Sequence, residues 1–445
     1  MFATLTHLLA DNPAQIYQGI AVSDLDGDGA YECFVGTHGG RNLVLKWGGD
    51  AFYDVALDVL ADQRGPAMGI AAGDVDGDGR EEIYVANGEA APDRLFAWRR
   101  GGWVDLFAGY GTRPVSSQAV LALDRFGMGR YGFLVANEGG PFRFFELMGG
   151  DRLEDHAPVL GLARIAGGRS LVAGPIVSAG LDIYGGNEGI GNMLFVAGGQ
   201  GQYLEQAAHF GLADAAAAAR GVALIDMNFD GRFDVVCANA AGTQRIFLQG
   251  SQGSFAVVEM AGWNEARRGR SVVVADFDND GFEEIFLHCH GEANRLLGWR
   301  DGDWRGLDCG AAAEPRGFGT GAAVGDFDQD GRLELLLAHG EGHAQPLSLY
   351  GSIANGNHWL RVEVLTAQGA PARGALVKIQ SEGRVQMRVI DCGSGYLCQM
   401  EPVAHFGLGQ SSSVDWLELR WLDGVTRRVL NPQVDSLHRI AYPSG

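Results

Sequence analysis

The stretch Asp24-Leu-Asp-Gly-Asp-Gly-Ala-Tyr-Glu32 decides the fold. It places carboxylates at positions 1, 3, 5 and 9 of a nine-residue loop, with a glycine at position 6, where the chain has to turn. Hard oxygen ligands at alternating positions, beside a residue that readily adopts a positive φ, suit Ca²⁺. The stretch therefore predicts a calcium-binding loop.

The loop recurs at a nearly constant spacing. Its first position falls, in chain order, at Asp24, Asp74, Asp124, Gly174, Asp226, Asp276 and Asp326. Each unit has an apolar run before the loop, a β-rich run after it, and two further strand-like runs separated by turns. Four short strands in a unit of about 50 residues are typical of a propeller blade. We therefore predict an all-β fold built on a seven-bladed β-propeller.

The seventh unit lacks a fourth strand of its own. Leu347–Tyr350 is its third run, and the repeat stops near Asn357. The N-terminal run Phe2–Leu8 precedes the first unit and can supply the missing strand. We expect it to close the ring, because closure removes an exposed sheet edge. The propeller would then span residues 1–352, and a second domain would span residues 353–445.

Five of the loops keep oxygen ligands at positions 1, 3, 5 and 9, and the backbone carbonyl at position 7 would add a further ligand. The expected ligands are Asp24, Asp26, Asp28, Ala30 and Glu32; Asp74, Asp76, Asp78, Arg80 and Glu82; Asp226, Asn228, Asp230, Arg232 and Asp234; Asp276, Asp278, Asp280, Phe282 and Glu284; and Asp326, Asp328, Asp330, Arg332 and Glu334. We therefore expect about five calcium sites.

Two loops have lost the ligand pattern. Asp124 is followed by Phe126 and Met128 where carboxylates belong, and the loop that begins at Gly174 keeps only Asp182. These two blades should be free of metal. An EF-hand is excluded as well, because that loop needs a glutamate at position 12 between helices. Position 12 of the five intact loops is instead an apolar residue inside a β-rich run.

The repeated Asp-x-Asp-x-Asp-Gly-x-x-Asp/Glu units resemble the FG-GAP/VCBS calcium repeats of integrin-type propellers. The resemblance covers residues 1 to about 352. It implies that each ion staples the turn between the first two strands of a blade, which is a structural role rather than a catalytic one.

The segment after Asn357 has strand-like runs with period-2 alternation, such as His358–Val364 and Val414–Trp421, and predicts a small antiparallel β domain. Asn357-His-Trp-Leu, Gly393-Ser-Gly-Tyr396 and His405-Phe-Gly-Leu-Gly409 resemble the ASPIC/UnbV domain. A propeller followed by this domain resembles the cartilage acidic protein (CRTAC) homologue family and proteins of bacterial enediyne biosynthesis. The resemblance suggests a secreted or periplasmic protein, although the N-terminus lacks the basic region of a signal peptide.

The turn after the second strand of each blade is polar and should lie on the side of the ring opposite the loops. Aligned by the repeat, these turns contain His38; Asn87 and Glu89; Asn137 and Glu138; Asn187 and Glu188; Asn239; His288, His290 and Glu292; and His339, Glu341 and His343. We expect a polar mouth there, in which His288 and His290 share one strand face and could chelate a transition metal with His339 or a nearby glutamate. Alternatively, the asparagines cap strand ends and the charges are solvated.

Composition excludes some partners. A net charge of −21 argues against nucleic acid, since phosphate binding needs a basic face. No apolar run is long enough for membrane insertion. Cys392 and Cys398 flank a short glycine-containing turn, and they could form a disulfide in an oxidising compartment or stay reduced.

Three functions stay open on the sequence. The first is a calcium-stabilised interaction module for a protein, a glycan or a small molecule, since no nucleophile triad, phosphate loop or dinucleotide fingerprint is present. The second is an enzyme of secondary metabolism, with Glu138, Glu188, His290 or His339 as acid–base candidates. The third is a lectin, in which exposed tryptophans would stack on sugars; the candidates are Trp47, Trp98, Trp103, Trp263 and Trp299. No cofactor other than Ca²⁺ is expected.

Overall fold

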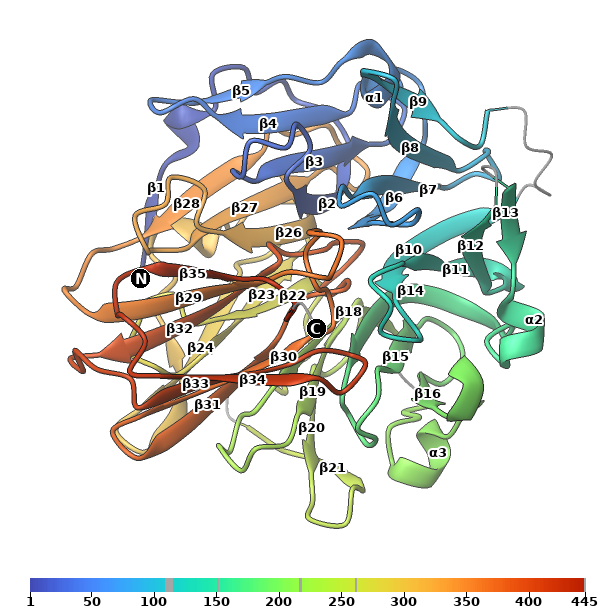
Figure 1. Ribbon diagram of the computed structural model, residues 1–445. Coiled ribbons are helices and arrows are strands. Elements are labelled where there is room, and N and C mark those ends of the chain that lie inside the picture. Colours follow the sequence, from blue (N-terminus) through green and yellow to red (C-terminus); the bar gives the residue numbers. More distant parts are fainter. Residues whose placement is uncertain (109–114, 150–151, 216–217, 261, 444–445) are drawn as a thin grey trace.

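The computed structural model describes residues 1–108, 115–149, 152–215, 218–260 and 262–443, and strands dominate it (Figure 1). Blade one contains β2 (Tyr17–Ser23), β3 (Glu32–Thr37), β4 (Leu43–Trp47) and β5 (Phe52–Asp54). Blade two contains β6 (Ala67–Gly73), β7 (Glu82–Asn87), β8 (Arg94–Arg99) and β9 (Gly102–Asp105). Blade three contains β10 (Ser116–Leu123), β11 (Gly132–Pro141), β12 (Arg143–Met148) and β13 (Arg152–Asp155). Blade four contains β14 (Ile165–Gly174), β15 (Asp182–Asn187), β16 (Met193–Ala197) and β17 (Tyr203–Glu205).

The remaining blades follow the same order. Blade five contains β18 (Ala219–Ile225), β19 (Asp234–Asn239), β20 (Arg245–Gln249) and β21 (Phe255–Val257). Blade six contains β22 (Gly269–Ala275), β23 (Glu284–Cys289), β24 (Arg295–Arg300) and β25 (Asp303–Leu307). Blade seven contains β26 (Gly319–Gly325), β27 (Glu334–His339), β28 (Ser348–Ser352) and, from the N-terminus, β1 (Phe2–Thr4). Short helices lie outside the blade strands: η1 (Thr6–Leu8), α1 (Asp58–Ala61), α2 (Ala157–Leu160), η2 (Gly199–Gly201), α3 (Ala207–Phe210) and η3 (Ala311–Ala313).

Strand β1 occupies the edge of blade seven, antiparallel to β28, with Phe2 opposite Ser352 and Thr4 opposite Tyr350. The strand is shorter than the run Phe2–Leu8, because Thr6–Leu8 forms the 3₁₀ turn η1. The side chain of Phe2 is buried and meets Phe277 of blade six edge to face, with ring centroids 4.9 Å apart. Apolar packing therefore holds the first residues of the chain at the seam between the last two blades.

Blades three and four form one continuous sheet rather than two separate ones. Strand β11 runs for ten residues, and its end pairs with the start of β14, with Glu138 opposite Gly167 and Pro141 opposite Ile165. The second strands of the other blades stop after six residues, and single bridges beyond them, such as His38 to Pro66 and Glu188 to Ala218, join them to the next blade. The extra length of β11 explains the difference.

The C-terminal domain consists of a three-stranded sheet in the order β32-β29-β35 and a four-stranded sheet in the order β31-β30-β33-β34. Its strands are β29 (His358–Val364), β30 (Leu376–Ser381), β31 (Arg384–Val389), β32 (Val403–Gly409), β33 (Trp416–Arg420), β34 (Thr426–Leu430) and β35 (Leu437–Ile440). The two sheets bury a common apolar core that includes Leu360, Val377 and Phe406. Pairing is antiparallel except between β29 and β35, which run parallel, because β35 joins the far edge of the first sheet after the chain leaves the second.

The segment 391–401 of this domain enters the centre of the ring, and we call it the plug. Its backbone bonds to the first strands of several blades: the carbonyl of Leu397 accepts the N–H of Ile70 (3.2 Å), that of Cys392 accepts Ala122 N–H (2.9 Å), and Gly395 and Val222 exchange two bonds (3.0 and 2.7 Å). The first strands of neighbouring blades lie beside one another around this segment. The C-terminal domain, in red, accordingly lies across the ring in Figure 1.

None of the helices in the described part of the chain has the length and apolar character needed to cross a membrane.

Candidate metal centres

The five acidic loops share one local structure. The position-1 aspartate accepts the N–H of the position-6 glycine, as between Asp24 Oδ2 and Gly29 (2.9 Å), and four other loops repeat this bond. The position-9 carboxylate accepts the N–H at position 2, as between Glu32 Oε2 and Leu25 (2.7 Å), again in every loop. The N–H at position 7 donates to the position-5 carboxylate; these donors are Ala30, Arg80, Arg232, Phe282 and Arg332. Backbone bonds therefore orient the carboxylates.

The loops need two left-handed residues rather than one. Position 6 is glycine throughout, with φ of +87° at Gly29, but position 4 is left-handed as well. Blades one and two place Gly27 and Gly77 there, whereas blades five to seven place Phe229, Asn279 and Gln329 at φ near +60°. A side chain in this region is mildly strained, on the order of 1 kcal/mol. The sequence pattern could have indicated position 4 only in the two glycine-containing loops.

Carboxylate oxygens converge in four of the five loops, within 4.8 Å of one another. The groups are Asp24, Asp26 and Glu32; Asp74, Asp76 and Asp78; Asp276, Asp278 and Glu284; and Asp326, Asp328 and Glu334. Among the described residues, the loop of blade five forms no such group. Its position 3 is Asn228, whose amide donates to Asp230 Oδ2 (2.9 Å), and Arg232 also binds Asp230. Blade five is therefore the least convergent of the five acidic loops.

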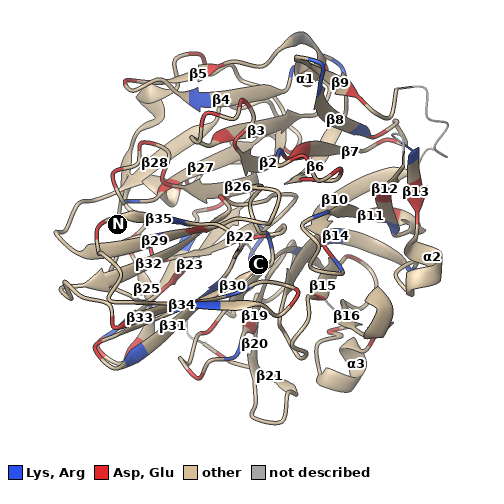
Figure 2. Cartoon of the chain, viewed as in Figure 1, with Lys and Arg blue, Asp and Glu red and all other residues tan. Residues whose placement is uncertain are grey.

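A basic side chain from the third strand of the blade stands among the carboxylates of three loops. Lys46 Nζ lies 2.5 Å from Asp26, 2.7 Å from Asp28 and 2.9 Å from Glu32. Arg99 contacts Asp76 and Glu82 (2.6 and 3.0 Å), and Arg300 contacts Asp278 and Glu284 (2.5 and 2.8 Å). Figure 2 shows Asp and Glu in red and Lys and Arg in blue along the chain. The cationic groups stand at the place where a metal ion would be attracted.

The donor set fits a hard divalent cation. Burial raises the pKa of Glu32 to about 7, although the hydrogen bond from Lys46 acts in the opposite direction. Burial, with only partial relief from the Val75 N–H, raises the pKa of Glu82 to about 8. In blade six, Asp276 Oδ1 is buried and has no hydrogen-bond partner. Buried carboxylates that lack neighbouring positive charge are stabilised by a cation that prefers oxygen ligands, such as Ca²⁺.

The C-terminal domain docks on these loops. Arg361 Nη1 lies 2.8 Å from Asp326 Oδ2, and the N–H of Gly407 donates to Asp276 Oδ2 (3.0 Å). Beside the loops, the fully buried Arg373 pairs with Glu81 (2.5 Å), and Arg388 pairs with Glu283 (3.0 Å). Sequence reasoning missed these arginines, because nothing near them in the chain indicates which loop they meet.

The two loops that lack the ligand pattern are held by hydrogen bonds. In blade four, Asp182 accepts bonds from the N–H groups of Val177 (2.8 Å), Ser178 (2.7 Å) and Ala197 (2.8 Å), and from the Ser178 hydroxyl (2.7 Å). In blade three, Asp124 Oδ2 accepts the N–H of Gly129 (2.6 Å). Their remaining carboxylates are thus satisfied by the chain itself.

Cys392 and Cys398, which could have formed a disulfide, are both buried free thiols. Cys392 packs with Leu121 and Tyr396, whereas Cys398 packs on the opposite side with Ile20 and Ala322. The plug turns between them, so that their side chains enter different apolar clusters.

Ion pairs and capped turns occupy most of the expected polar mouth. The asparagines cap the turns, as in the bonds from Asn87 to Pro92 O (2.6 Å) and from Asn137 to Pro141 O (2.6 Å). Glu138 pairs with Arg169 (2.6 Å), and Glu188 pairs with Arg169 and Arg220 (3.0 and 2.8 Å). These glutamates are engaged by guanidinium groups, which leaves neither of them placed beside a histidine for proton transfer.

The expectation that His288 and His290 face one metal is wrong. Strand β23 ends at Cys289, so His290 lies beyond the strand, where it bridges to Phe318 and lies 3.9 Å from Glu341. His288 is buried and faces Glu314 and His339 instead. The candidates Glu138, Glu188, His290 and His339 therefore do not form one site.

The tryptophans considered for sugar stacking pack within their own blades or, in the case of Trp299, against the neighbouring blade. Trp263 is fully buried, Trp98 meets Trp103 edge to face at 5.8 Å, and Trp299 meets Phe229 at 5.3 Å. Trp47 packs on Phe52 at 5.1 Å. Their rings serve blade packing.

Known families and proteins match most of the chain. The model described as FG-GAP-like repeat matches residues 24–85 and 226–287, and the model described as ASPIC and UnbV matches residues 365–445. Cartilage acidic protein 1 of Xenopus tropicalis is 41% identical over 484 residues, covering 97% of this chain and 74% of that protein. Its counterpart in Homo sapiens is 39% identical, covering 97% and 73%. Among solved structures, the BP39L lectin of Burkholderia pseudomallei superposes with a TM-score of 0.51 at 13% identity, covering 77% of this chain and 98% of the lectin, a likeness of fold alone.

Proposed function

The chain belongs to the family of cartilage acidic protein 1, and on this premise we propose that it is a calcium-stabilised interaction protein. The observation that carries the proposal is the double role of the loop carboxylates. Asp276 and Asp326 belong to predicted ligand sets, and the same two side chains contact Gly407 and Arg361 of the C-terminal domain. The loops thus form the docking face of the second domain as well as the candidate ion sites.

Ca²⁺ would be held by the side chains at positions 1, 3, 5 and 9 of the acidic loops and would supply positive charge without redox or acid–base chemistry. The chain's own residues do the rest. Arg361, Arg373 and Arg388 bind carboxylates beside the loops, and the plug bonds to the first strands around the centre of the ring. Calcium would therefore stabilise the propeller and the docked domain together.

The mouth of the ring on the side away from the acidic loops is the surface proposed for a partner. Arg169, Arg220 and Arg270 lie there beside Glu138, Glu188 and Glu341. Such a ring of both signs suits a protein partner, because complementary charges steer association and select among partners. The pairing of the glutamates with arginines favours a binding function over catalysis. The packed tryptophans argue against a lectin, and binding of the protein to a glycan array would support one.

We also propose that the protein works where calcium is plentiful. Acidic-loop sites in extracellular modules bind Ca²⁺ with dissociation constants of roughly 10⁻⁴ to 10⁻³ M, which a secreted or periplasmic setting can satisfy. All six cysteines are buried, so an oxidising compartment finds no exposed thiol among them.

Hydrogen exchange on the full chain tests the proposal. Removing calcium with EGTA should accelerate exchange of the amides of the plug and of the first strands that it bonds, because the loops that hold the docked domain lose their ions. Mg²⁺ at matched ionic strength serves as the control and should not restore the protection. Equal exchange of the plug with and without calcium would refute the proposed coupling.

A further inference from the structure

Blade six breaks the repeat at a buried position. Twelve residues after the first loop position, the other six blades have alanine or glycine: Gly36, Ala86, Ala136, Gly186, Ala238 and Ala338. Blade six has His288 there, and its side chain is fully buried. The packing of a blade therefore does not require an imidazole at this position, and His288 needs another explanation.

The connection between blades six and seven breaks the repeat a second time. Twelve residues before the loop, Asp62 and Asp214 each bind an arginine of the following blade: Arg94 Nε lies 2.9 Å from Asp62, and Arg245 Nε lies 3.0 Å from Asp214. Glu314 holds the same repeat position before blade seven.

The arginine that would neutralise Glu314 is missing. Arg94 and Arg245 stand opposite Val85 and Cys237 in their sheets, and the residue opposite the corresponding Leu337 is Ser348. At the end of the second strand, His339 replaces the asparagine found as Asn87 and Asn239. A guanidinium–carboxylate pair has thus been exchanged for a carboxylate with two imidazoles.

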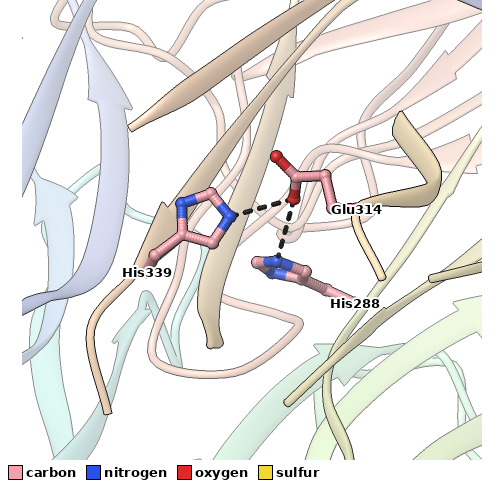
Figure 3. A group of neighbouring side chains, drawn as sticks. All are labelled: His288, Glu314 and His339. Atoms are coloured by element: carbon pink, nitrogen blue, oxygen red, sulfur yellow. Dashed lines mark hydrogen bonds and ion pairs between the residues drawn. The ribbon is translucent and has the colours of Figure 1, made fainter. Parts of the chain in front are cut away.

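The three side chains face one another (Figure 3). His339 Nε2 lies 2.9 Å from Glu314 Oε2, and His288 Nε2 lies 3.9 Å from the same oxygen. The two imidazole rings meet edge to face, with centroids 5.3 Å apart. His288 comes from β23, His339 from β27, and Glu314 from the residue after η3, so the group joins blade six, blade seven and the connection between them.

The surroundings orient two of these groups. His339 Nδ1 donates to the carbonyl of Pro346 (2.9 Å), so Nε2 is the nitrogen that faces Glu314, and it would release its proton on binding a metal ion. The Tyr350 hydroxyl donates to Glu314 Oε1 (2.6 Å), so Oε2 is the oxygen that faces the histidines. Metal-binding histidines and carboxylates are typically fixed by such outer hydrogen bonds.

His288 has both ring nitrogens buried without a hydrogen-bond partner. A neutral imidazole carries a lone pair on one of these two nitrogens. A buried polar group without a partner is unfavourable by roughly 1–3 kcal/mol, and a ligand that accepts this lone pair would remove the penalty.

We propose that His288, Glu314 and His339 bind one divalent transition-metal ion of the Zn²⁺ class, which staples blade six to blade seven. Two imidazoles with one carboxylate form a donor set that suits Zn²⁺, Co²⁺ or Fe²⁺, whereas the loops offer only the oxygens that Ca²⁺ prefers. The site lies at the ring seam, where β1 closes the last blade. It is independent of the calcium loops and of the proposed partner surface.

Cobalt titration tests the site, because Co²⁺ bound by nitrogen ligands absorbs visible light whereas Ca²⁺ does not. The full chain, without a polyhistidine tag, is treated with 1,10-phenanthroline, desalted and kept saturated with Ca²⁺. We expect one equivalent of Co²⁺ to bind with visible absorption, and Zn²⁺ to abolish the absorption by displacement. Absence of saturable binding to the wild-type chain would overturn the proposal.

The repeat supplies well-matched variants. His288→Ala and His339→Asn introduce the residues of other blades, and each should weaken Co²⁺ binding at least about 100-fold, since loss of a ligand exceeds the 10- to 100-fold effect of an outer-shell change. Glu314→Gln, nearly isosteric, is a further variant should either histidine variant fold poorly. His290→Ala with His343→Ala removes nearby histidines and should leave binding unchanged. Unchanged cobalt binding in His288→Ala and Glu314→Gln would show that the metal binds elsewhere.

Discussion

The loops of blade one and blade four occupy the same place in the repeat but are stabilised in different ways. In blade one, Asp24, Asp26, Asp28 and Glu32 crowd together, and Lys46 is the cation among them. In blade four, Asp182 alone remains, and four hydrogen bonds from the chain satisfy it. One carboxylate can be stabilised by N–H and O–H donors, whereas several carboxylates repel one another and need positive charge. The need for an ion therefore follows the number of carboxylates and not the backbone of the turn.

Removal of calcium should produce the largest effect, because it acts on all the acidic loops and on neither of the others. An ion present at 100 times its dissociation constant contributes about 2.7 kcal/mol. The loss of several ions should lower the melting temperature by about 10 °C or more, since 1 kcal/mol corresponds to roughly 2–4 °C in a domain of 150–250 residues. Thermal unfolding with EGTA, against Mg²⁺ at equal ionic strength, measures the shift. An unchanged melting temperature would contradict the structural role of calcium.

The repeat, the closed ring and the acidic loops could be predicted from sequence, because each depends on residues close in the chain. The plug and Arg373 could not, since their partners lie hundreds of residues away. Arg361 could not either, because its contact with Asp326 depends on how the second domain docks. Lys46 was missed for a related reason: a lysine in a strand gives no local sign of the loop it faces.

The histidines show the same limit. The sequence indicated that His288 and His339 are neighbours, and the structure places them together. It assigned His290 as the next partner, because alternation in a strand was extended past Cys289, where the strand ends. Glu314 lies in the segment that connects blades six and seven, where no strand pattern indicates which way a side chain faces. Only comparison with Asp62 and Asp214, at the same position of the repeat, indicates that it faces the following blade.

Asp182→Asn should give the next largest effect, and it should not depend on calcium. The amide would turn an NH₂ group toward N–H donors that now bond to Asp182, which leaves buried donors unpaired at about 3 kcal/mol. Equilibrium unfolding in denaturant, with Ca²⁺ and with EGTA, should show the same loss in both.

Glu334→Gln is the matched variant in an intact loop. The amide oxygen can still accept the N–H of Phe327, but the side chain no longer offers a charged ligand. The variant should therefore lose about 2 kcal/mol of unfolding free energy when calcium is saturating, and none when calcium is absent. If the loss of stability depended on calcium equally in Asp182→Asn and Glu334→Gln, the two kinds of loop would not differ in their need for an ion.

Lys46→Met should change stability in opposite directions with and without calcium. Without the ion, Asp26, Asp28 and Glu32 lose their cation, and stability should fall by about 1 kcal/mol, a modest value because the pair is partly exposed. With calcium, the ion no longer competes with the ammonium group, so calcium affinity should rise several-fold. Isothermal titration and unfolding in EGTA measure the two effects. Arg428→Met, on β34, is the control and should leave calcium affinity unchanged, because the Arg428 side chain pairs with Glu418 of the C-terminal domain. A fall in calcium affinity would show that Lys46 supports the ion rather than replacing it.

The smallest effect is expected when carboxylates are returned to blade three. Phe126 and Met128 are exposed, so Phe126→Asp with Met128→Asp should alter stability by less than about 0.5 kcal/mol. It should also add no calcium, because position 9 is Gly132, where a Cβ atom would lie 2.6 Å from Phe144 Cζ and 2.7 Å from the Phe145 carbonyl oxygen. The strand below the loop has closed the space in which a glutamate stands in blade one. Metal analysis of the purified variant should give the wild-type calcium count. One additional ion would mean that three carboxylates at positions 1, 3 and 5 suffice, and the position-9 residue would then orient the loop without being needed to bind the ion.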